Sequence, residues 1–216
     1  MPSIYYNRNF KSQHFYHLVN RGAYKKAIYK NNPDYQIFLE ILSYYLLYPR
    51  TKYFSYQKLV NKFEVRNLEK EHTVHLVAYC LMPNHFHLLL KQLPSATTKT
   101  NISNLMRRTM VTYAMYFQTK YKHEGAIFQG RYKNVVVDSS EQLLYLSKYI
   151  HLNPQKLTSN LIDYPHSSYP AYIKQVKSPK WLHPEYVLKL ETNYKQFIMT
   201  HTKDEQLQKI KTITLD

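Results

Sequence analysis

Hydrophobic and polar positions alternate most clearly from His85 to Leu90, where the chain reads His-Phe-His-Leu-Leu-Leu. Side chains two positions apart on a strand point to the same face, so His85 and His87 share one side and three large apolar residues share the other. About 7 Å separates such positions, which allows two imidazoles to converge on one ion. The alternation predicts a strand with a core face and a candidate metal-binding face, although two half-exposed histidines without a function would give the same pattern.

Periodicity also predicts the other elements of the chain. Residues 14–20, 73–81 and 128–138 are expected to supply three further strands. Helical spacing of apolar residues predicts helices after Asn32, over 101–122 and over 140–152, and Ser139 with Gln142 fits a capping box before the last one. The short turn before His85 should make the two strands that it joins antiparallel.

The order β-α-β-β-α-β-α predicts an α+β fold. We expect a ferredoxin-like antiparallel sheet with helices packed on one face and the other face available. Residues 1–172 are expected to form this domain, with the polar and charged residues 50–72 interpreted as an insertion. Residues 173–216 are interpreted as a small helical C-terminal extension.

The charge balance adds a polyanionic partner to this picture. The 216 residues include 30 Lys+Arg against 14 Asp+Glu, a formal net charge of +16, and nucleic acid is the commonest partner of so basic a protein. The 23 tyrosines offer faces on which unpaired bases can stack, although compositional bias would also produce them. A merely basic protein without such a partner is the alternative.

Other classes of protein are excluded by what the chain lacks. The single cysteine, Cys80, rules out an internal disulfide and a zinc site built from several cysteines. No apolar run approaches the roughly 18 residues of a membrane span, and the N-terminus has no hydrophobic signal region. We therefore expect a cytoplasmic protein that does not bind a membrane.

The last predicted helix of the domain offers a second half for the histidine site. Tyr149 and Asn153 are four residues apart and therefore lie on one face of that helix. If the helix crosses the sheet beside His85 and His87, the four groups form a phosphoryl-transfer site. Two imidazoles and the Asn153 oxygen would hold a divalent ion. Tyr149 would attack phosphorus, helped by the positive charge of the ion and of Lys148.

A tyrosine nucleophile differs from activated water because it stores the cleaved bond as a phosphotyrosine ester, which a second strand end can attack. This chemistry suits the cutting and rejoining of DNA. Because the chain has 23 tyrosines, the choice of Tyr149 stays open at this point. Tyr145 lies one turn earlier on a similar face, and Tyr113 and Tyr116 on the long helix are further alternatives.

His85-Phe86-His87 matches the His-hydrophobic-His motif of the HUH single-strand nucleases. The wider run from Tyr79 to Leu90 resembles the REP-associated tyrosine transposases, relatives of the small single-tyrosine insertion-sequence transposases. Four more blocks agree with that family in the same order, within residues 14–172. They are Asn20-Arg21-Gly22, Phe128-Gln-Gly-Arg-Tyr-Lys133, Tyr149-Ile-His-Leu-Asn-Pro154 and Asp163-Tyr-Pro-His-Ser-Ser-Tyr-Pro-Ala-Tyr172.

The resemblance implies a ferredoxin-like fold, a Mg²⁺ or Mn²⁺ ion, and single-stranded or hairpin DNA as the substrate. It implies that His85 and His87 are metal ligands and that Asn153 is a third ligand. It also implies that Tyr149 is the nucleophile, which favours Tyr149 over Tyr145. It leaves open whether the protein is a monomer or a homodimer, and whether the helix of Tyr149 completes the site of its own chain or of a partner.

Six basic residues are candidates for contacts with DNA phosphates. They lie beside the predicted fourth strand, on the polar side of the long helix, or within and beside the matching blocks. For each of them, a solvated surface position is the alternative. The six are Arg21, Arg107, Arg108, Arg131, Lys133 and Lys148.

Histidines outside the motif receive weaker interpretations. His151 is expected to be structural, because it points away from Tyr149 on a helical wheel. His14 and His17 alternate to opposite faces of the first strand and therefore cannot act as a pair. His72 and His75 would be able to supply a further ligand, but their faces are not defined by the pattern.

The sequence thus predicts a metal-dependent strand transferase. It would nick single-stranded DNA near a hairpin, form a 5′-phosphotyrosine bond through Tyr149 and rejoin ends. One alternative is a non-catalytic, domesticated nucleic-acid-binding protein on the same fold. Another is a metal hydrolase that uses water, in which Tyr149 is structural and no covalent adduct forms.

Overall fold

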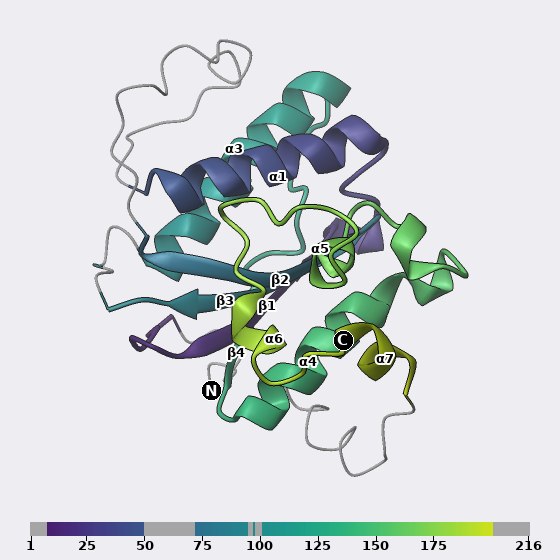
Figure 1. The fold of residues 1–216 in the computed structure, drawn as a ribbon. Coiled ribbons are helices and arrows are strands. Elements are labelled where there is room, and N and C mark those ends of the chain that lie inside the picture. The colour runs from purple at the N-terminus through teal and green to yellow at the C-terminus, as the bar shows by residue number, and fades with distance from the viewer. Residues whose placement is uncertain (1–7, 50–71, 95–96, 98–100, 201–216) are drawn as a thin grey trace.

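The computed structural model describes residues 8–49, 72–94, 97 and 101–200, and a four-stranded sheet lies at its centre (Figure 1). The strands are β1 (Phe15–Arg21), β2 (Val74–Met82), β3 (His85–Gln92) and β4 (Lys133–Val137). Their order is β2-β3-β1-β4 and all neighbours are antiparallel, which confirms the predicted α+β, ferredoxin-like arrangement. The expected insertion at 50–72 lies outside the described residues except for His72.

The β2–β3 hairpin sets the direction of the two histidines of the motif. Met82 pairs with His85 on either side of a two-residue turn. From there the side chains alternate, so that Phe86 and Leu88 are fully buried in the core on one face of the sheet. Leu89 belongs to a second core on the other face, and His87 shares that face with it. The predicted division of this strand is confirmed.

Helices α1 (Asn32–Leu47) and α3 (Ile102–Tyr121) cover the face that carries Phe86 and Leu88 (Figure 1). The N-cap of α1 is Asn31, one residue before the predicted position, and a proline follows in the first turn. These are the two helices that a ferredoxin-like sheet needs on one side, and both were predicted from their apolar spacing.

The opposite face of the sheet is covered as well, so the expectation that helices lie on one face only is wrong. Helix α4 (Ser140–Leu152) lies on this second face, below the sheet in Figure 1. Its residues Leu143, Leu146 and Ile150 are buried in one cluster with Cys80 and Leu89 of the sheet. The apolar stripe of α4 is therefore buried against the apolar side chains that surround the histidines on this face.

The described part of the C-terminal extension, residues 173–200, packs against α4. Val187, Tyr194 and Ile198 are buried in the same cluster as the apolar side of α4. No helix of the described part of the chain is long and apolar enough to cross a membrane. The short elements outside the sheet are η2 (Ala23–Lys25), η4 (Asn153–Lys156), η5 (Leu161–Asp163), α5 (Tyr169–Tyr172), α6 (Glu185–Leu188) and α7 (Tyr194–Met199).

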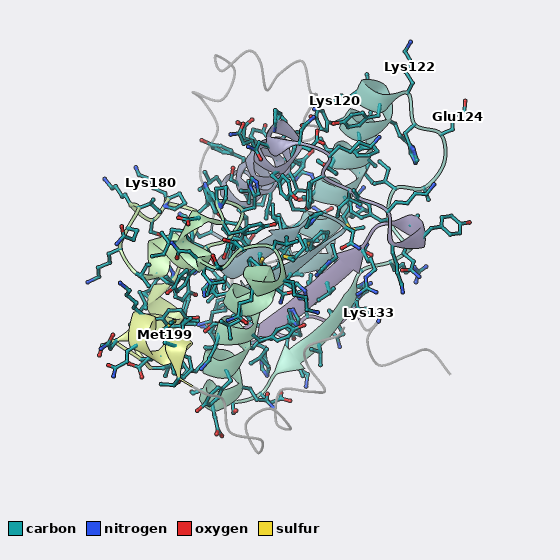
Figure 2. All side chains as sticks on the ribbon, turned by 90° about the vertical axis from the view of Figure 1, so that its right-hand side faces the viewer. Lys120, Lys122, Glu124, Lys133, Lys180 and Met199 are labelled. Carbon is teal, nitrogen blue, oxygen red and sulfur yellow. The ribbon has the colours of Figure 1, made fainter. Side chains whose placement is uncertain are left out.

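A buried carboxylate links the two helices of the first face. Asp34 on α1 is fully buried, and Lys120, labelled in Figure 2, reaches it from α3. The carboxylate accepts hydrogen bonds from Lys120 Nζ (2.7 Å), Tyr116 (2.8 Å), Tyr121 (2.8 Å) and the Lys30 N–H (2.7 Å). Burial acts to raise the pKa of Asp34, but these hydrogen bonds outweigh it and the pKa lies below its ordinary value.

We expect Asp34→Asn to lower the free energy of unfolding at neutral pH by about 2 kcal/mol, because Lys120 loses its buried anionic partner. The folded-state pKa of Asp34 is depressed. Its contribution is therefore present above the unfolded-state pKa and is lost as the pH falls through the folded-state pKa. Urea unfolding at pH 7 and at about pH 3 should show a smaller pH dependence in the variant than in the wild type.

The matched control is Glu124→Gln, which removes an exposed carboxylate. It should leave both the stability and its pH dependence unchanged. An Asp34→Asn protein with wild-type pH dependence would show that the network contributes nothing as an ion pair.

Candidate active site

Two histidines lie on the face of the sheet that α4 covers, at the end of β3 nearest the hairpin turn. His87 is fully buried and His85 is half-buried. Their ring centroids are 5.0 Å apart and their planes are inclined by 82°. Nδ1 of His85 hydrogen-bonds to Asn84 Oδ1 at 2.7 Å, which fixes the orientation of that ring. The structure therefore brings the two imidazoles of the motif together on one face.

Tyr149 extends from α4 onto this pair. Its ring centroid lies 5.6 Å from that of His87, in an edge-on arrangement with an interplanar angle of 85°. The phenol oxygen is buried and has no hydrogen-bond partner among the described residues. Burying an unsatisfied hydroxyl costs about 1–3 kcal/mol, so such a group in a folded protein calls for an explanation. A bound ion or phosphate at this place would supply the missing partner.

Asn153 follows α4 immediately, in the first position of η4. Its Nδ2 donates a hydrogen bond to the Tyr149 carbonyl at 3.1 Å, one helical turn back. An interaction with the Asn153 side chain acts to raise the pKa of the His85 ring, which places this amide beside that histidine.

A third histidine, which the sequence did not single out, completes the cluster. His17 on β1 is fully buried, and its Nε2 lies 3.0 Å from Nδ1 of His87. A hydrogen bond at Nδ1 fixes the tautomer of a histidine and leaves Nε2 as the coordinating atom. The signal was present in the alternation of the first strand, but recognising it requires the pairing of β1 with β3.

The electrostatic environment keeps both motif histidines neutral. Burial, followed by the charge of Arg21, lowers the pKa of His85 to about 4, against the opposing effect of Asn153. Burial also lowers the pKa of His87 well below its ordinary value, and His17, His85 and Arg21 add to the effect. Neutral imidazole is the form of histidine that binds metal ions, so the lowered pKa of each ring favours the form that a metal ion requires.

An open pocket of about 390 Å³ leads to this cluster. It is lined by Arg21 on β1, His85 on β3, and residues of α4 and η4 that include Tyr149, Asn153 and Lys156. The volume is within the range of pockets that bind small ligands. Arg21 was predicted as a DNA contact and lies here, whereas Lys156 was not predicted. The pocket combines the neutral His85 ring with two cations.

Two predicted DNA contacts are contradicted by their positions. Lys148 is buried, and its ammonium hydrogen-bonds to the carbonyls of Phe197 (2.9 Å) and Thr200 (2.5 Å) at the end of α7. It therefore neither contacts DNA nor assists Tyr149. Arg108 is buried on the far side of the sheet, where it donates to the Pro49 carbonyl at 2.7 Å. Both cations satisfy helix-end or loop carbonyls, which a sequence pattern does not show.

Other basic candidates stay predictions. Arg131 and Lys133 are exposed at the start of the edge strand β4, where Figure 2 labels Lys133. Arg107 is exposed on α3 and hydrogen-bonds to Asn104 at 2.8 Å. None of the three belongs to the pocket, so any contact with DNA would be made outside it.

The alternative tyrosines lie away from the histidine pair. Tyr113 and Tyr116 are buried in the core on the opposite face of the sheet. Tyr145, one turn before Tyr149, packs instead against Phe197, with ring centroids 5.5 Å apart. Tyr149 is thus the tyrosine among the four candidates whose ring contacts His87.

His151 has the structural position expected for it. It is fully buried, and its two ring nitrogens hydrogen-bond to the Tyr194 hydroxyl at 2.8 Å and to Ser168 Oγ at 2.7 Å. Tyr194 comes from the C-terminal segment, whereas Ser168 lies just before α5.

Comparison with known protein families decides the identity of this fold and site. The family described as IS200-like transposases matches residues 10–153, a range that ends on Asn153 and includes the histidine pair and Tyr149. The chain belongs to the IS200-like transposase family. No curated protein sequence matches it. Membership of this family supports a transposase-like function. It does not assign roles to individual residues, which are proposed below from the geometry of the site.

One solved structure agrees at the level of the fold. A REP-associated tyrosine transposase bound to a REP hairpin matches with a TM-score of 0.52 at 15% identity, over 81% of this chain and 87% of that one. A predicted transposase from Deinococcus radiodurans R1 gives a TM-score of 0.37 at 17% identity, over 67% of this chain and 93% of that one. This protein therefore shares its fold with the REP-associated tyrosine transposase.

We expect His17→Phe to lower the affinity of the pocket for Mn²⁺ by about tenfold or more, because Nδ1 of His87 loses the hydrogen bond that orients it. Paramagnetic resonance of free Mn²⁺ would measure the affinity. His14→Phe is the matched control, since His14 is exposed and lies outside the cluster. The melting temperature in EDTA should first show that His17→Phe is folded like the wild type. If its Mn²⁺ affinity is then unchanged, His17 has only a packing role.

Proposed function

We propose that this IS200-like transposase is a metal-dependent single-strand DNA strand transferase in which Tyr149 is the nucleophile. The observation that carries the proposal is the buried phenol oxygen of Tyr149, which finds no hydrogen-bond partner in the described part of the chain and belongs to a ring that lies against His87. Tyr194 and Tyr172 on the same side of the sheet satisfy their hydroxyls. Tyr29 in the opposite core also has a buried hydroxyl without a partner, so it is the position against the histidines that distinguishes Tyr149.

The residues of the pocket fit a divalent ion. His85 and His87 would supply two neutral nitrogens and Asn153 an oxygen, a set that suits Mn²⁺ and accommodates Mg²⁺ with water completing its coordination. When bound there, such an ion would polarise a phosphate oxygen and offset negative charge as it develops. Arg21 and Lys156 add fixed positive charge at the same pocket and would attract the phosphate itself.

The proposed chemistry replaces one phosphate ester bond by another in each step, so that the number of ester bonds does not change. The Tyr149 oxygen forms a bond to phosphorus while the bond from phosphorus to the 3′ oxygen breaks. The phenol proton passes to solvent, and the departing 3′ oxygen takes up a proton to become a hydroxyl. The 5′ end remains as a phosphotyrosine ester. A 3′ hydroxyl of another strand then attacks this ester, restores a phosphodiester and releases the tyrosine.

Charge and fold support DNA as the substrate of this chemistry. The net charge of +16 favours a polyanion, and the fold is that of a transposase solved with a REP hairpin. We therefore propose single-stranded DNA beside a hairpin as the substrate. Arg21 would contact the phosphate at the cleavage point, and the exposed Arg131, Lys133 and Arg107 would contact the backbone farther away.

The site is proposed to be complete within one chain. The histidines of β3 and the tyrosine of α4 meet without a partner molecule, and α4 is held by a large apolar cluster of its own chain. A monomer would then be able to carry out a full cleavage step.

Non-catalytic binding to DNA and hydrolysis by water are the competing functions. A binder gives neither product nor adduct when it is incubated with labelled hairpin DNA and Mn²⁺. A hydrolase gives product without adduct. The proposed transferase gives a labelled protein band on a denaturing gel.

We expect Tyr149→Phe to abolish both cleavage and the covalent adduct, because the nucleophilic oxygen is removed. DNA affinity should change by less than about twofold, because the basic side chains proposed to bind phosphate are unchanged. Denaturing gels and fluorescence anisotropy would measure the two properties. Tyr145→Phe is the matched control on the same helix, and it should retain activity because its ring packs on Phe197. An adduct formed by Tyr149→Phe would remove this residue from the mechanism.

We expect His87→Ala to lose both Mn²⁺ affinity and cleavage, since it removes a proposed ligand. Equal amounts of Tyr149→Phe and His87→Ala should remain inactive when mixed. If each site is built from one chain, the first variant still lacks its nucleophile and the second still lacks a metal ligand. Recovery of the adduct in the mixture would show that α4 is exchanged between two chains. Unchanged Mn²⁺ affinity in His87→Ala, measured by calorimetry, would contradict the ligand assignment.

A further inference from the structure

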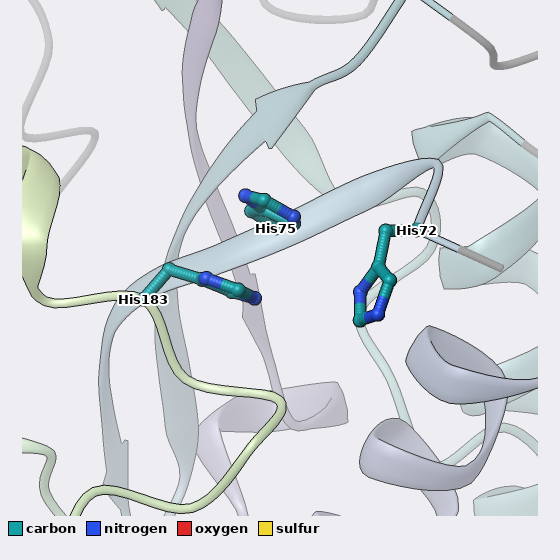
Figure 3. A group of neighbouring side chains, drawn as sticks. All are labelled: His72, His75 and His183. Atoms are coloured by element: carbon teal, nitrogen blue, oxygen red, sulfur yellow. The ribbon is translucent and has the colours of Figure 1, made fainter. Parts of the chain in front are cut away.

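A second group of histidines lies at the other end of the sheet. His72 lies two residues before β2, His75 is on that strand, and His183 belongs to the C-terminal segment before α6 (Figure 3). His75 pairs with Lys91, whereas Met82 at the far end of β2 pairs with His85 of the active site. A separation on the order of 20 Å along the strand follows, so the two histidine groups are distinct.

The three rings of this second group converge. One nitrogen from each lies within 4.8 Å of the others. The rings of His75 and His183 stack with centroids 3.5 Å apart, and His72 faces them at 5.8 and 6.2 Å with its plane nearly perpendicular to both. Figure 3 shows the three side chains directed toward a common space from two separate parts of the chain.

Two of these histidines carry the outer partners that metal ligands usually have. Nδ1 of His75 lies 3.0 Å from the Tyr186 hydroxyl, and Nδ1 of His183 lies 2.9 Å from the Glu185 carboxylate. Such bonds fix the ring orientation and make Nε2 the coordinating atom. Lys91 brings a positive charge close to this group, since its ammonium lies 4.3 Å from the centre of the Tyr186 ring. The carboxylate of Glu185 offsets that charge.

We propose that His72, His75 and His183 form a second metal site, one that takes Zn²⁺ or a similar borderline transition-metal ion. Three imidazoles without an oxygen ligand suit such ions and disfavour Mg²⁺. Zinc binds histidine nitrogen at about 2.0–2.1 Å, which places the nitrogens of a tetrahedral site about 3.4 Å apart. The stacked rings of His75 and His183 have to turn, and the exposed His72 side chain has to approach them, before three in-plane nitrogen lone pairs can meet on one ion; water takes the fourth position.

An ion in this place would fasten the C-terminal segment to the sheet. The His183 N–H already donates to the Leu76 carbonyl at 2.8 Å, and Leu182 forms a parallel bridge with Leu76. The helices that follow, α6 and α7, pack on α4, which carries Tyr149. The site is therefore a structural one that stabilises the support of α4, and it does not depend on the proposed chemistry at Tyr149.

The test uses zinc itself and the full-length chain. Calorimetry with ZnCl₂ in excess MgCl₂, on protein in which His85→Ala and His87→Ala remove the active-site pair, should show one zinc ion per chain. A hundredfold excess of zinc over its Kd should raise the melting temperature by on the order of 5 °C. Adding His72→Ala or His183→Ala should weaken zinc binding at least about tenfold and abolish this rise, whereas His14→Ala, an exposed histidine elsewhere, should change neither.

Because His183 is partly packed against the sheet, His72→Ala is the decisive variant: its side chain is exposed, so folding should be unaffected. With an intact active site, either substitution should lower the number of bound zinc ions by one. Zinc binding and thermal stabilisation that survive both substitutions, or the absence of zinc binding when only the active-site pair is removed, would overturn the proposal. Neither result would bear on Tyr149, whose test is the adduct.

Discussion

The packing of α4 on the histidine face of the sheet is the contact on which the active site depends. Strand β3 divides its side chains, with Phe86 and Leu88 in one core and Leu89 in the other. The second core is what holds α4, through Leu146 and Ile150. A polar pair such as His85 and His87 can lie in this apolar surface because Tyr149 covers it with an aromatic ring. The same burial that stabilises the helix therefore places the phenol.

Several polar residues of α4 hold the helix and take no part in the chemistry. Ser147 and His151 both hydrogen-bond to the Tyr194 hydroxyl, and Lys148 satisfies carbonyls at the end of α7. These buried groups gain fixed partners only when the C-terminal segment is in place. The extension that the sequence suggested as an appendage is consequently part of the support of α4. This explains why Val187 and Ile198 of the extension are fully buried or nearly so.

The strand that carries the histidine pair was predictable because a period of two defines which side chains share a face. The apolar stripe of α4 predicted that it packs, but a stripe does not say on which side of a sheet, so the second covered face was missed. His17 was missed for a related reason, since its contact with His87 arises between strands far apart in sequence. The prediction for Lys148 was wrong because a cation near a nucleophile in sequence was assumed to be near it in space.

The charges around the pocket combine two requirements that oppose each other. A metal ion needs neutral imidazoles, while DNA is attracted by cations. In the proposed function Arg21 would meet both requirements. It lies opposite His85 in the pairing of β1 with β3, and its charge adds to burial, the larger cause, in lowering the pKa of that ring to about 4. A carboxylate in the place of Arg21 would hold an ion more strongly, but it would favour an imidazolium at His85 and repel phosphate. The pairing of a strand-end arginine with a buried histidine is thus consistent with a site that must accept an ion and a polyanion together.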